Sequence, residues 1–238
     1  TLCSVLWAVS VLTSALQAAT LTVANSNDSG PGSLRESIAL AAPGDTIAFE
    51  AFLAGQPINL TSGEHYIDKN LTIQGLGAEY TVIDANSLSR VLRIAASADV
   101  TVTGVTMQHG FEVRGGGIYN EGSLALTECI VTANVTGFCI EGSCHRGFAQ
   151  GCGIQNLGTL VLSHTLVSDN RTLVPESRSP GGGLNNSGRA IILNSSFTGN
   201  SGSSARGQGL LGAAAYNDAA GELQMINSTV KGNSGVNG

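Results

Sequence analysis

A glycine-to-asparagine repeat constrains the fold of this chain more than any other feature of the sequence. Three segments align, each beginning with glycine and ending with asparagine: 115–120, 151–156 and 181–186. A weaker fourth copy begins at Gly212. In the first three copies a second asparagine follows nineteen positions after the first glycine, and successive copies start 30 to 36 residues apart. A period of this length is typical of solenoids, in which each unit stacks on the next.

Apolar residues recur at matching positions of the copies and form four columns in the alignment. The second and third columns are two residues apart, which is the alternation of a strand with one face inward. One copy is too small to bury such a face, but stacking at about 4.8 Å turns each column into a continuous apolar core. We therefore expect an all-β fold, a right-handed parallel β-helix. The columns are Ile118, Ile154, Leu184 and Ala215; Leu124, Leu160, Ala190 and Leu223; Leu126, Leu162, Ile192 and Met225; and Val131, Val167, Phe197 and Val230.

Helical repeat arrays such as ankyrin and tetratricopeptide repeats have similar periods and are the alternative. They need long helix-forming runs, whereas glycine, asparagine, serine, threonine and valine dominate here. No stretch of ten residues with a helical period occurs after residue 45, which excludes a helical solenoid.

Two asparagine columns accompany the apolar ones. Asparagine tolerates the left-handed backbone of a sharp bend, and its amide can both donate and accept hydrogen bonds along a stack. Several also lie in Asn-x-Ser/Thr sequons, as at Asn134, Asn170 and Asn227, but a structural turn is the simpler reading than glycosylation. We expect two structural ladders, Asn120, Asn156, Asn186 and Asn217, and Asn134, Asn170, Asn200 and Asn233.

Three regions of the chain are expected along its length. Residues 1–19 are apolar and end in small residues, which is typical of a partial secretory signal, with an uncleaved membrane anchor as the alternative. Residues 20–57 are expected to form an N-terminal cap with a capping helix near 33–41, where Ser33 and Glu36 have the spacing of a capping box. Residues 58–238 form the repeats. Because the sequence stops directly after a repeat, we expect the natural protein to continue.

The cysteines give one disulfide prediction. Cys139 and Cys144 flank a short loop, and in an exported protein we expect them to form a disulfide. A metal site made of Cys144, His145 and Cys152 is the alternative, but it lacks a paired Cys-x-x-Cys motif. We expect neither a metal nor another cofactor.

Composition limits the possible partners. The chain has 11 basic and 17 acidic residues, so a nucleic-acid partner is not expected. Carboxylates in the repeats fall at scattered positions and form no acidic column. Asp169 with Arg171 is the best single catalytic candidate, although a solvated pair at a bend is the simpler reading, and His109, His145 and His164 have no supporting pattern. We therefore assign no catalytic residues.

Insertions between copies offer a binding surface. They span 135–150, 171–180 and 201–211 and leave the repeat at the same corner, so they should lie on one side of the solenoid. The first insertion carries the candidate binding residues Phe138, His145, Arg146 and Phe148. A glycan or a host or cell-surface protein would meet this surface.

The sequence resembles bacterial surface and secreted proteins with parallel β-helix repeats. Residues 21–25, 27–38 and 43–47 resemble the N-terminal signature of these proteins. The Gly-Gly-Gly-Ile and Phe197-Thr-Gly-Asn200 motifs are similar to repeats of the polymorphic outer-membrane proteins, although the other copies have valine at the Phe197 position. The resemblance implies a passenger-like stalk displayed outside the cell.

Two functional hypotheses follow. The leading one is a non-catalytic secreted or cell-surface β-helix, monomeric and not membrane-spanning once mature, which acts as a stalk, adhesin or binding module. The alternative is a polysaccharide lyase or glycoside hydrolase, because the pectate-lyase-like fold also supports those enzymes.

Overall fold

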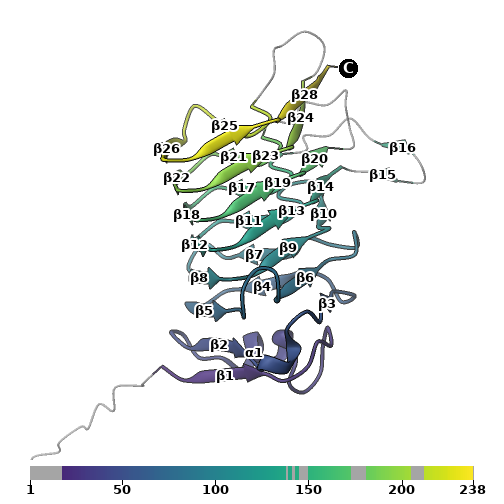
Figure 1. Ribbon diagram of the computed structural model, residues 1–238, viewed down its shortest axis with the longest axis vertical. Helices are drawn as coiled ribbons and strands as arrows, with labels where there is room; N and C mark the ends of the chain where they lie inside the picture. Colours follow the sequence, from purple (N-terminus) through teal and green to yellow (C-terminus); the bar gives the residue numbers. More distant parts are fainter. Residues whose placement is uncertain are drawn as a thin grey trace, which may run out of the picture.

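The computed structural model describes residues 18–137, 139–140, 143–144, 150–172, 181–204 and 212–237. Regular structure in these residues is nearly all β-strand. Successive coils stack along one axis, and their equivalent strands form four wholly parallel sheets that run along this axis (Figure 1). This arrangement is consistent with a parallel β-helix, and it confirms the predicted all-β class.

We number the sheets 1 to 4 in the order in which the chain visits them in each coil. Sheet 1 contains β4 (His65–Ile67), β7 (Leu92–Ile94), β11 (Ile118–Asn120), β17 (Ile154–Asn156), β21 (Leu184–Asn186) and β25 (Ala215–Asn217). Sheet 2 contains β1 (Thr20–Val23), β2 (Thr46–Phe49), β5 (Leu71–Gln74), β8 (Asp99–Thr103), β12 (Ser123–Thr127), β18 (Thr159–Ser163), β22 (Arg189–Leu193) and β26 (Glu222–Ile226).

Sheets 3 and 4 complete each coil. Sheet 3 contains β3 (Ile58–Asn59), β6 (Val82–Asp84), β9 (Thr106–Gln108), β13 (Ile130–Thr132), β19 (Leu166–Ser168), β23 (Ser196–Thr198) and β27 (Thr229–Lys231). Sheet 4 contains β10 (Phe111–Glu112), β14 (Val135–Thr136), β20 (Arg171–Thr172), β24 (Ser201–Ser204) and β28 (Ser234–Asn237). Within the described residues, one pair of strands is antiparallel, β15 (Cys139–Ile140) with β16 (Ser143–Cys144).

Strand register confirms the four apolar columns. Each column member pairs with its equivalent one coil later, as Ile118 does with Ile154 and Val131 with Val167. The members in β11 to β23 are buried and belong to one core. In the last described coil the same positions open to solvent, with Met225 37% and Val230 55% exposed.

Glycines at the start of each copy meet two different requirements. The first glycine of every copy has a left-handed backbone, with φ of +59° at Gly115 and +72° at Gly181. The third glycine needs space instead, because a Cβ on Gly153 would lie 2.6 Å from the carbonyl oxygen of Gly183 in the next coil. Both requirements favour glycine and explain why the motif recurs.

Helix α1 (Leu34–Leu40) lies where the sequence predicts a helix. Its N-cap is Ser33, whose hydroxyl accepts a hydrogen bond from the backbone N–H of Glu36 at 3.2 Å. Glu36 does not close the reciprocal half of the capping box, and its carboxylate accepts from the N–H of Gly32 instead. The helix buries Leu34 and Ile38 and contacts β1 and β2 (Figure 1).

The remaining N-terminal segments extend the stack. A short 3-10 helix, η1 (Ala51–Leu53), follows β2. Strands β1 and β2 pair in register with each other and with β5, so sheet 2 continues into the range expected to form the cap. The expected signal, apart from its last two residues, lies outside the described residues. None of the described helices has the length and apolar character needed to cross a bilayer.

Candidate functional site

The first asparagine column forms a hydrogen-bonded ladder between sheets 1 and 2. The amide nitrogen of Asn120 donates to the side-chain oxygen of Asn156 at 2.7 Å, Asn156 donates to Asn186 at 2.7 Å, and Asn186 donates to Asn217 at 2.6 Å. The ladder starts at Asn120, whose Oδ1 is buried and receives no hydrogen bond in the described structure. The preceding coil has the apolar residue Ile94 in that register.

The second asparagine column forms a ladder between sheets 3 and 4. Amide-to-amide distances are 2.9 Å at each step, from Asn134 to Asn170, to Asn200 and to Asn233. Each of the last three side-chain oxygens also accepts the backbone N–H of the preceding ladder asparagine, and the N–H of Gly110 closes the first. Asn134 and Asn170 are fully buried, so their sequons cannot carry glycans while the chain is folded.

Left-handed bends do not coincide with the ladder asparagines, which corrects one expectation. None of the eight ladder residues, all of which are described, has a positive φ. At the second ladder the bend lies one residue earlier, with φ of +53° at Ala133, +55° at Asp169 and +64° at Gly199. The amide must point inward to reach its partners, so the preceding residue takes the strained conformation.

A third polar ladder lies between sheets 2 and 3 and was not expected from the sequence. The backbone N–H of Thr165 donates to the hydroxyl of Ser195 at 3.1 Å, and the N–H of Ser195 donates to the hydroxyl of Ser228 at 3.2 Å. Cys129 has the equivalent place one coil earlier, where its thiol lies 3.4 Å from the carbonyl oxygen of Val102. The mixture of cysteine, threonine and serine concealed a column that has the repeat spacing.

Cysteine geometry differs along the chain. The backbone register places Cys139 directly opposite Cys144 in β15 and β16, but their side chains lie outside the described part, so the disulfide stays a prediction. Cys129 and Cys152 are buried and form no disulfide. The thiol of Cys152 lies 3.0 Å from the hydroxyl of Thr136, and burial raises the pKa of both free thiols to about 11.

The expected loop surface cannot be placed. Phe138, His145, Arg146 and Phe148 lie outside the described residues, and so do half of the first insertion and most of the other two. The insertions begin differently from the expectation, because their first residues form β14, β20 and β24 of sheet 4. Three of the five strands of sheet 4 have two residues each, and β24 and β28 have four residues with no apolar alternation, so the sequence does not predict this sheet. No group of three or more His, Cys, Asp or Glu side chains among the described residues could hold a metal ion.

An aromatic and cationic column lies on the outer face of sheet 1. Tyr66, Arg93 and Tyr119 occupy the middle positions of β4, β7 and β11 and are in register. The guanidinium carbon of Arg93 is 5.5 Å from the ring centroid of Tyr66 and 5.7 Å from that of Tyr119, so one cation contacts two rings. Arg93 also pairs with Glu121 at 2.9 Å, and this hydrogen bond raises the pKa of Arg93.

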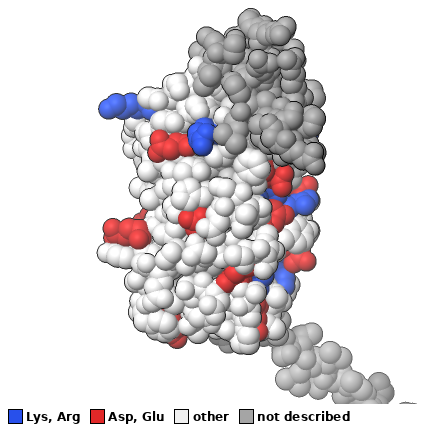
Figure 2. All heavy atoms as spheres, turned by 90° about the vertical axis from the view of Figure 1, so that its right-hand side faces the viewer, with Lys and Arg blue, Asp and Glu red and all other residues white. Residues whose placement is uncertain are grey.

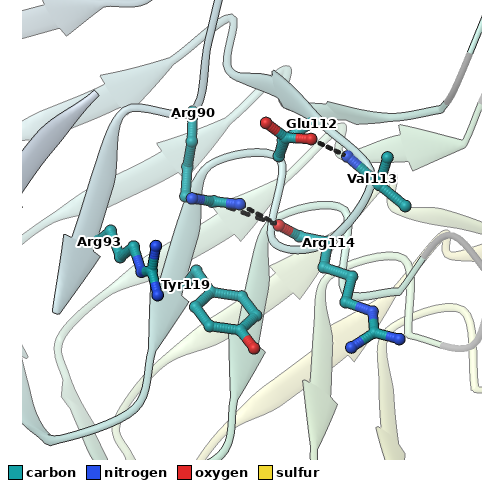
Figure 3. A pocket seen from close by; sticks show the side chains of 6 residues that line it. All are labelled: Arg90, Arg93, Glu112, Val113, Arg114 and Tyr119. Carbon is teal, nitrogen blue, oxygen red and sulfur yellow. Dashed lines mark hydrogen bonds between the residues drawn. The ribbon is translucent and has the colours of Figure 1, made fainter. Parts of the chain in front are cut away.

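Beside this column lies an open hollow of about 450 Å³, which we call the arginine–tyrosine hollow (Figure 3). Arg90 is its fixed member, because it is buried, pairs with Glu64, and donates to the carbonyl oxygens of Arg114 and Gly115. In Figure 3 the Tyr119 ring lies between the side chains of Arg93 and Arg114. The hollow is lined by Arg90, Arg93, Glu112, Val113, Arg114 and Tyr119.

Two groups in the hollow keep unused bonding capacity. Arg114 is exposed, and no hydrogen bond or ion pair joins its guanidinium to another residue in the described structure. The carboxylate of Glu112 accepts one hydrogen bond, from the backbone N–H of Val113 at 2.8 Å. The hollow can therefore offer a bidentate cation and a carboxylate acceptor to a ligand.

A second hollow lies at the bend before the second asparagine ladder, and we call it the corner groove. It has a volume of about 480 Å³, and its lining includes His109, Ala133, Asp169 and Arg171. His109 Nδ1 lies 2.8 Å from a carboxylate oxygen of Asp84, which lies in the preceding coil. Burial alone would raise the pKa of Asp84, but hydrogen bonds from Asn86, Gln108 and His109 lower it.

Asp169 and Arg171, the pair considered from the sequence, both lie at the corner groove but do not bind each other. The structure places no ion pair between these two described side chains. Asp169 leans instead toward Gly199, where an added Cβ would lie 2.3 Å from its carboxylate oxygen. The imidazole of His109, which had no supporting pattern in the sequence, is the better positioned group, because Asp84 orients it.

Charged side chains of both signs are few and scattered on the face that Figure 2 shows.

No protein-family model, no curated protein and no solved structure matches this chain.

Proposed function

We propose that this chain is an exported, non-catalytic β-helix protein that acts as a stalk, adhesin or binding module. The observation that carries the proposal is that the polar groups of the chain fall into two sets, one inside the coils and one on the outer surface. Inside the coils, amides and hydroxyls bond to one another in ladders, whereas arginine and tyrosine side chains gather in an open hollow outside. A rigid scaffold with a shallow outer hollow suits recognition of a large partner.

We place the protein outside the cell, in the extracellular space or at a bacterial outer membrane. The apolar segment at residues 1–19 and the resemblance to polymorphic outer-membrane proteins support this location. Its partner would be a glycan or a protein of a host or cell surface and not a nucleic acid, and the mature domain would be a monomer outside the bilayer. We also propose that the coils wind in the right-handed sense, as parallel crossover connections almost always do, with α1 as the lid of the first coil.

Display and binding can be tested together with the full chain. We expect a fluorescently labelled chain to bind mammalian cells or a glycan array. We also expect the chain, expressed in a bacterium with an initiator Met and a basic leader region placed before Thr1, to be cleaved near Ala18 or Ala19 and exported. Retention in the cytoplasm with an intact leader would contradict export. Failure to bind any cell or glycan would contradict the binding role.

The enzyme alternative is favoured by one observation, the His109 and Asp84 pair in the corner groove. A carboxylate-oriented imidazole is a common general base, and Arg171 could neutralise a uronate beside it. Incubation of the full chain with acidic polysaccharides, followed by measurement of released reducing ends and unsaturated products, tests this alternative. Cleavage that is lost in His109→Ala would establish the enzyme and overturn the non-catalytic proposal.

A further inference from the structure

We propose that the arginine–tyrosine hollow binds a sugar ring that carries a single carboxylate. This inference rests on the proposed binding function and names the chemical class of its ligand. Arg114 would hold the carboxylate and Glu112 would accept hydrogen bonds from the hydroxyl groups of the sugar. Tyr119, whose ring centroid already lies 5.1 Å from the guanidinium carbon of Arg90 and 5.7 Å from that of Arg93, would line the site beside the sugar.

Charge pairing singles out Arg114 as the anion-binding residue. The hollow contains three guanidinium groups, but Arg90 is paired with Glu64 and Arg93 is paired with Glu121. Arg114 has no such partner in the described structure. A guanidinium binds a carboxylate through two parallel hydrogen bonds, and such pairs are stronger than neutral hydrogen bonds.

The backbone below this residue is fixed in place. Nitrogen atoms of the Arg90 guanidinium lie 2.9 and 3.2 Å from the carbonyl oxygen of Arg114. The N–H of Gly115 bonds to the carbonyl oxygen of Gln150 one coil later. Because the surrounding backbone is held from two sides, the Arg114 side chain projects from a preorganised segment, which lowers the entropy lost on binding.

Glu112 distinguishes a carboxylated sugar from a phosphate monoester. A dianionic group beside the Glu112 carboxylate would face like-charge repulsion, whereas one carboxylate matches the one uncompensated guanidinium. A free acceptor on Glu112 also suits a ligand with several hydroxyl groups. The volume of about 450 Å³ is of the size of small-ligand sites.

Titration calorimetry with the full chain tests the inference. The probes are digalacturonic acid, a hyaluronan tetrasaccharide and sialyllactose, so that uronates and sialates are separate arms, and each has a carboxyl-reduced counterpart. We expect at least one carboxylated probe to bind. Its carboxyl-reduced form should bind at least about ten times more weakly. Arg114→Gln should cause a similar loss for the carboxylated probe and no further loss for the reduced one.

Matched variants separate recognition from folding. Arg114→Lys keeps the charge but not the bidentate geometry, and we expect it to recover part of the affinity. Arg189→Gln removes an exposed arginine of sheet 2 that lies 3.5 Å from Glu222, and we expect it to bind as the unaltered chain does. Circular dichroism should show the same folded spectrum for all of these variants.

Three outcomes would overturn the inference. They are equal affinity for carboxylated and reduced sugars, unchanged affinity in Arg114→Gln, and no binding of any carboxylated probe. If the chain still binds cells or other glycans in those cases, the proposed binding function stands without this ligand. If the chain binds neither cells nor any glycan, both the ligand inference and the proposed binding function are wrong.

Discussion

At the scale of single residues, buried polar side chains decide the stability of this chain. A buried amide costs free energy unless its hydrogen bonds are made, and the second ladder makes nearly all of them. His65 is the opposite case, because it faces the core of the first complete coils and neither ring nitrogen has a partner among the described residues. The two cases predict different consequences of mutation and pH.

Asn170→Ala should destabilise the chain strongly. The substitution removes the acceptor of both the amide and the backbone N–H of Asn134, and it removes the donor to Asn200 and to the carbonyl oxygen of Val131. Each buried group left unpaired costs about 1–3 kcal/mol, so we expect a loss of at least about 3 kcal/mol in the free energy of unfolding. Urea denaturation followed by circular dichroism measures it.

Asn59→Ala is the control for the ladder. Asn59 is exposed on β3, and we expect its substitution to change the free energy of unfolding by less than about 0.5 kcal/mol. Equal effects of the two substitutions would show that the ladder contributes no more than a surface amide does.

His65 should make the chain less stable in mild acid. Burial is the main reason that its pKa falls to about 3, the positive charge of Arg35 lowers it further, and Asp28 opposes the shift. Between pH 6.5 and pH 3 the unfolded chain therefore binds a proton that the folded chain does not. Stability from this residue is complete above pH 6.5 and falls by about 1.4 kcal/mol for each pH unit below it.

His65→Leu tests this pH dependence. Leucine matches Leu92, the next residue in the same column, so the variant should fold and should lose the pH-dependent term. Urea midpoints at pH 7.5 and pH 5 should converge for the variant and differ for the unaltered chain. Asp28 does not titrate in this window. Burial raises the pKa of its carboxyl, but hydrogen bonds from Ser62, Arg35 and Thr61 hold that pKa well below its usual value. An equal pH dependence in both chains would disprove the assignment.

At the scale of elements, strands were easier to predict from the sequence than corners. Apolar alternation such as Leu124 and Leu126 marks a strand and also its inward face, so sheets 2 and 3 follow directly. Sheet 4 could not be predicted, because its strands are short and three of them, β14, β20 and β24, form the first residues of the insertions. Helix α1 was predictable for a local reason, the cap at Ser33, although its contact with β1 and β2 depends on tertiary packing.

Ser33→Ala should loosen the first strands and leave the later coils unchanged. Ser33 is fully buried and provides the N-cap of α1, and loss of such a cap costs about 1 kcal/mol. If α1 is a lid, amide hydrogen exchange should accelerate in α1, β1 and β2. Exchange in β18 and β22 is the internal control. A uniform change along the chain, or no change in β1 and β2, would contradict the lid.

At the scale of the whole molecule, the candidate binding surface depends on coils that the repeat alignment does not include. The column Tyr66, Arg93 and Tyr119 crosses three coils, and two of them precede the first regular copy at residue 115. Irregular coil lengths hide that register, so these residues could not be aligned from the sequence. The loop residues around His145 were a prediction from spacing alone and stay one, because they lie outside the described part.

A solenoid should transmit damage to neighbouring coils more than to distant ones. Phe197 is the largest fully buried side chain among the described residues and is stacked between Val167 and Val230 in sheet 3. Phe197→Ala would leave a cavity and cost about 3–5 kcal/mol. Because each coil contacts mainly its neighbours, hydrogen exchange should rise most in β19, β23 and β27 and least in β2 and β5. The conservative Phe197→Leu should show the same pattern with a smaller amplitude. Equal acceleration in all strands would instead mean that the coils unfold as one cooperative unit.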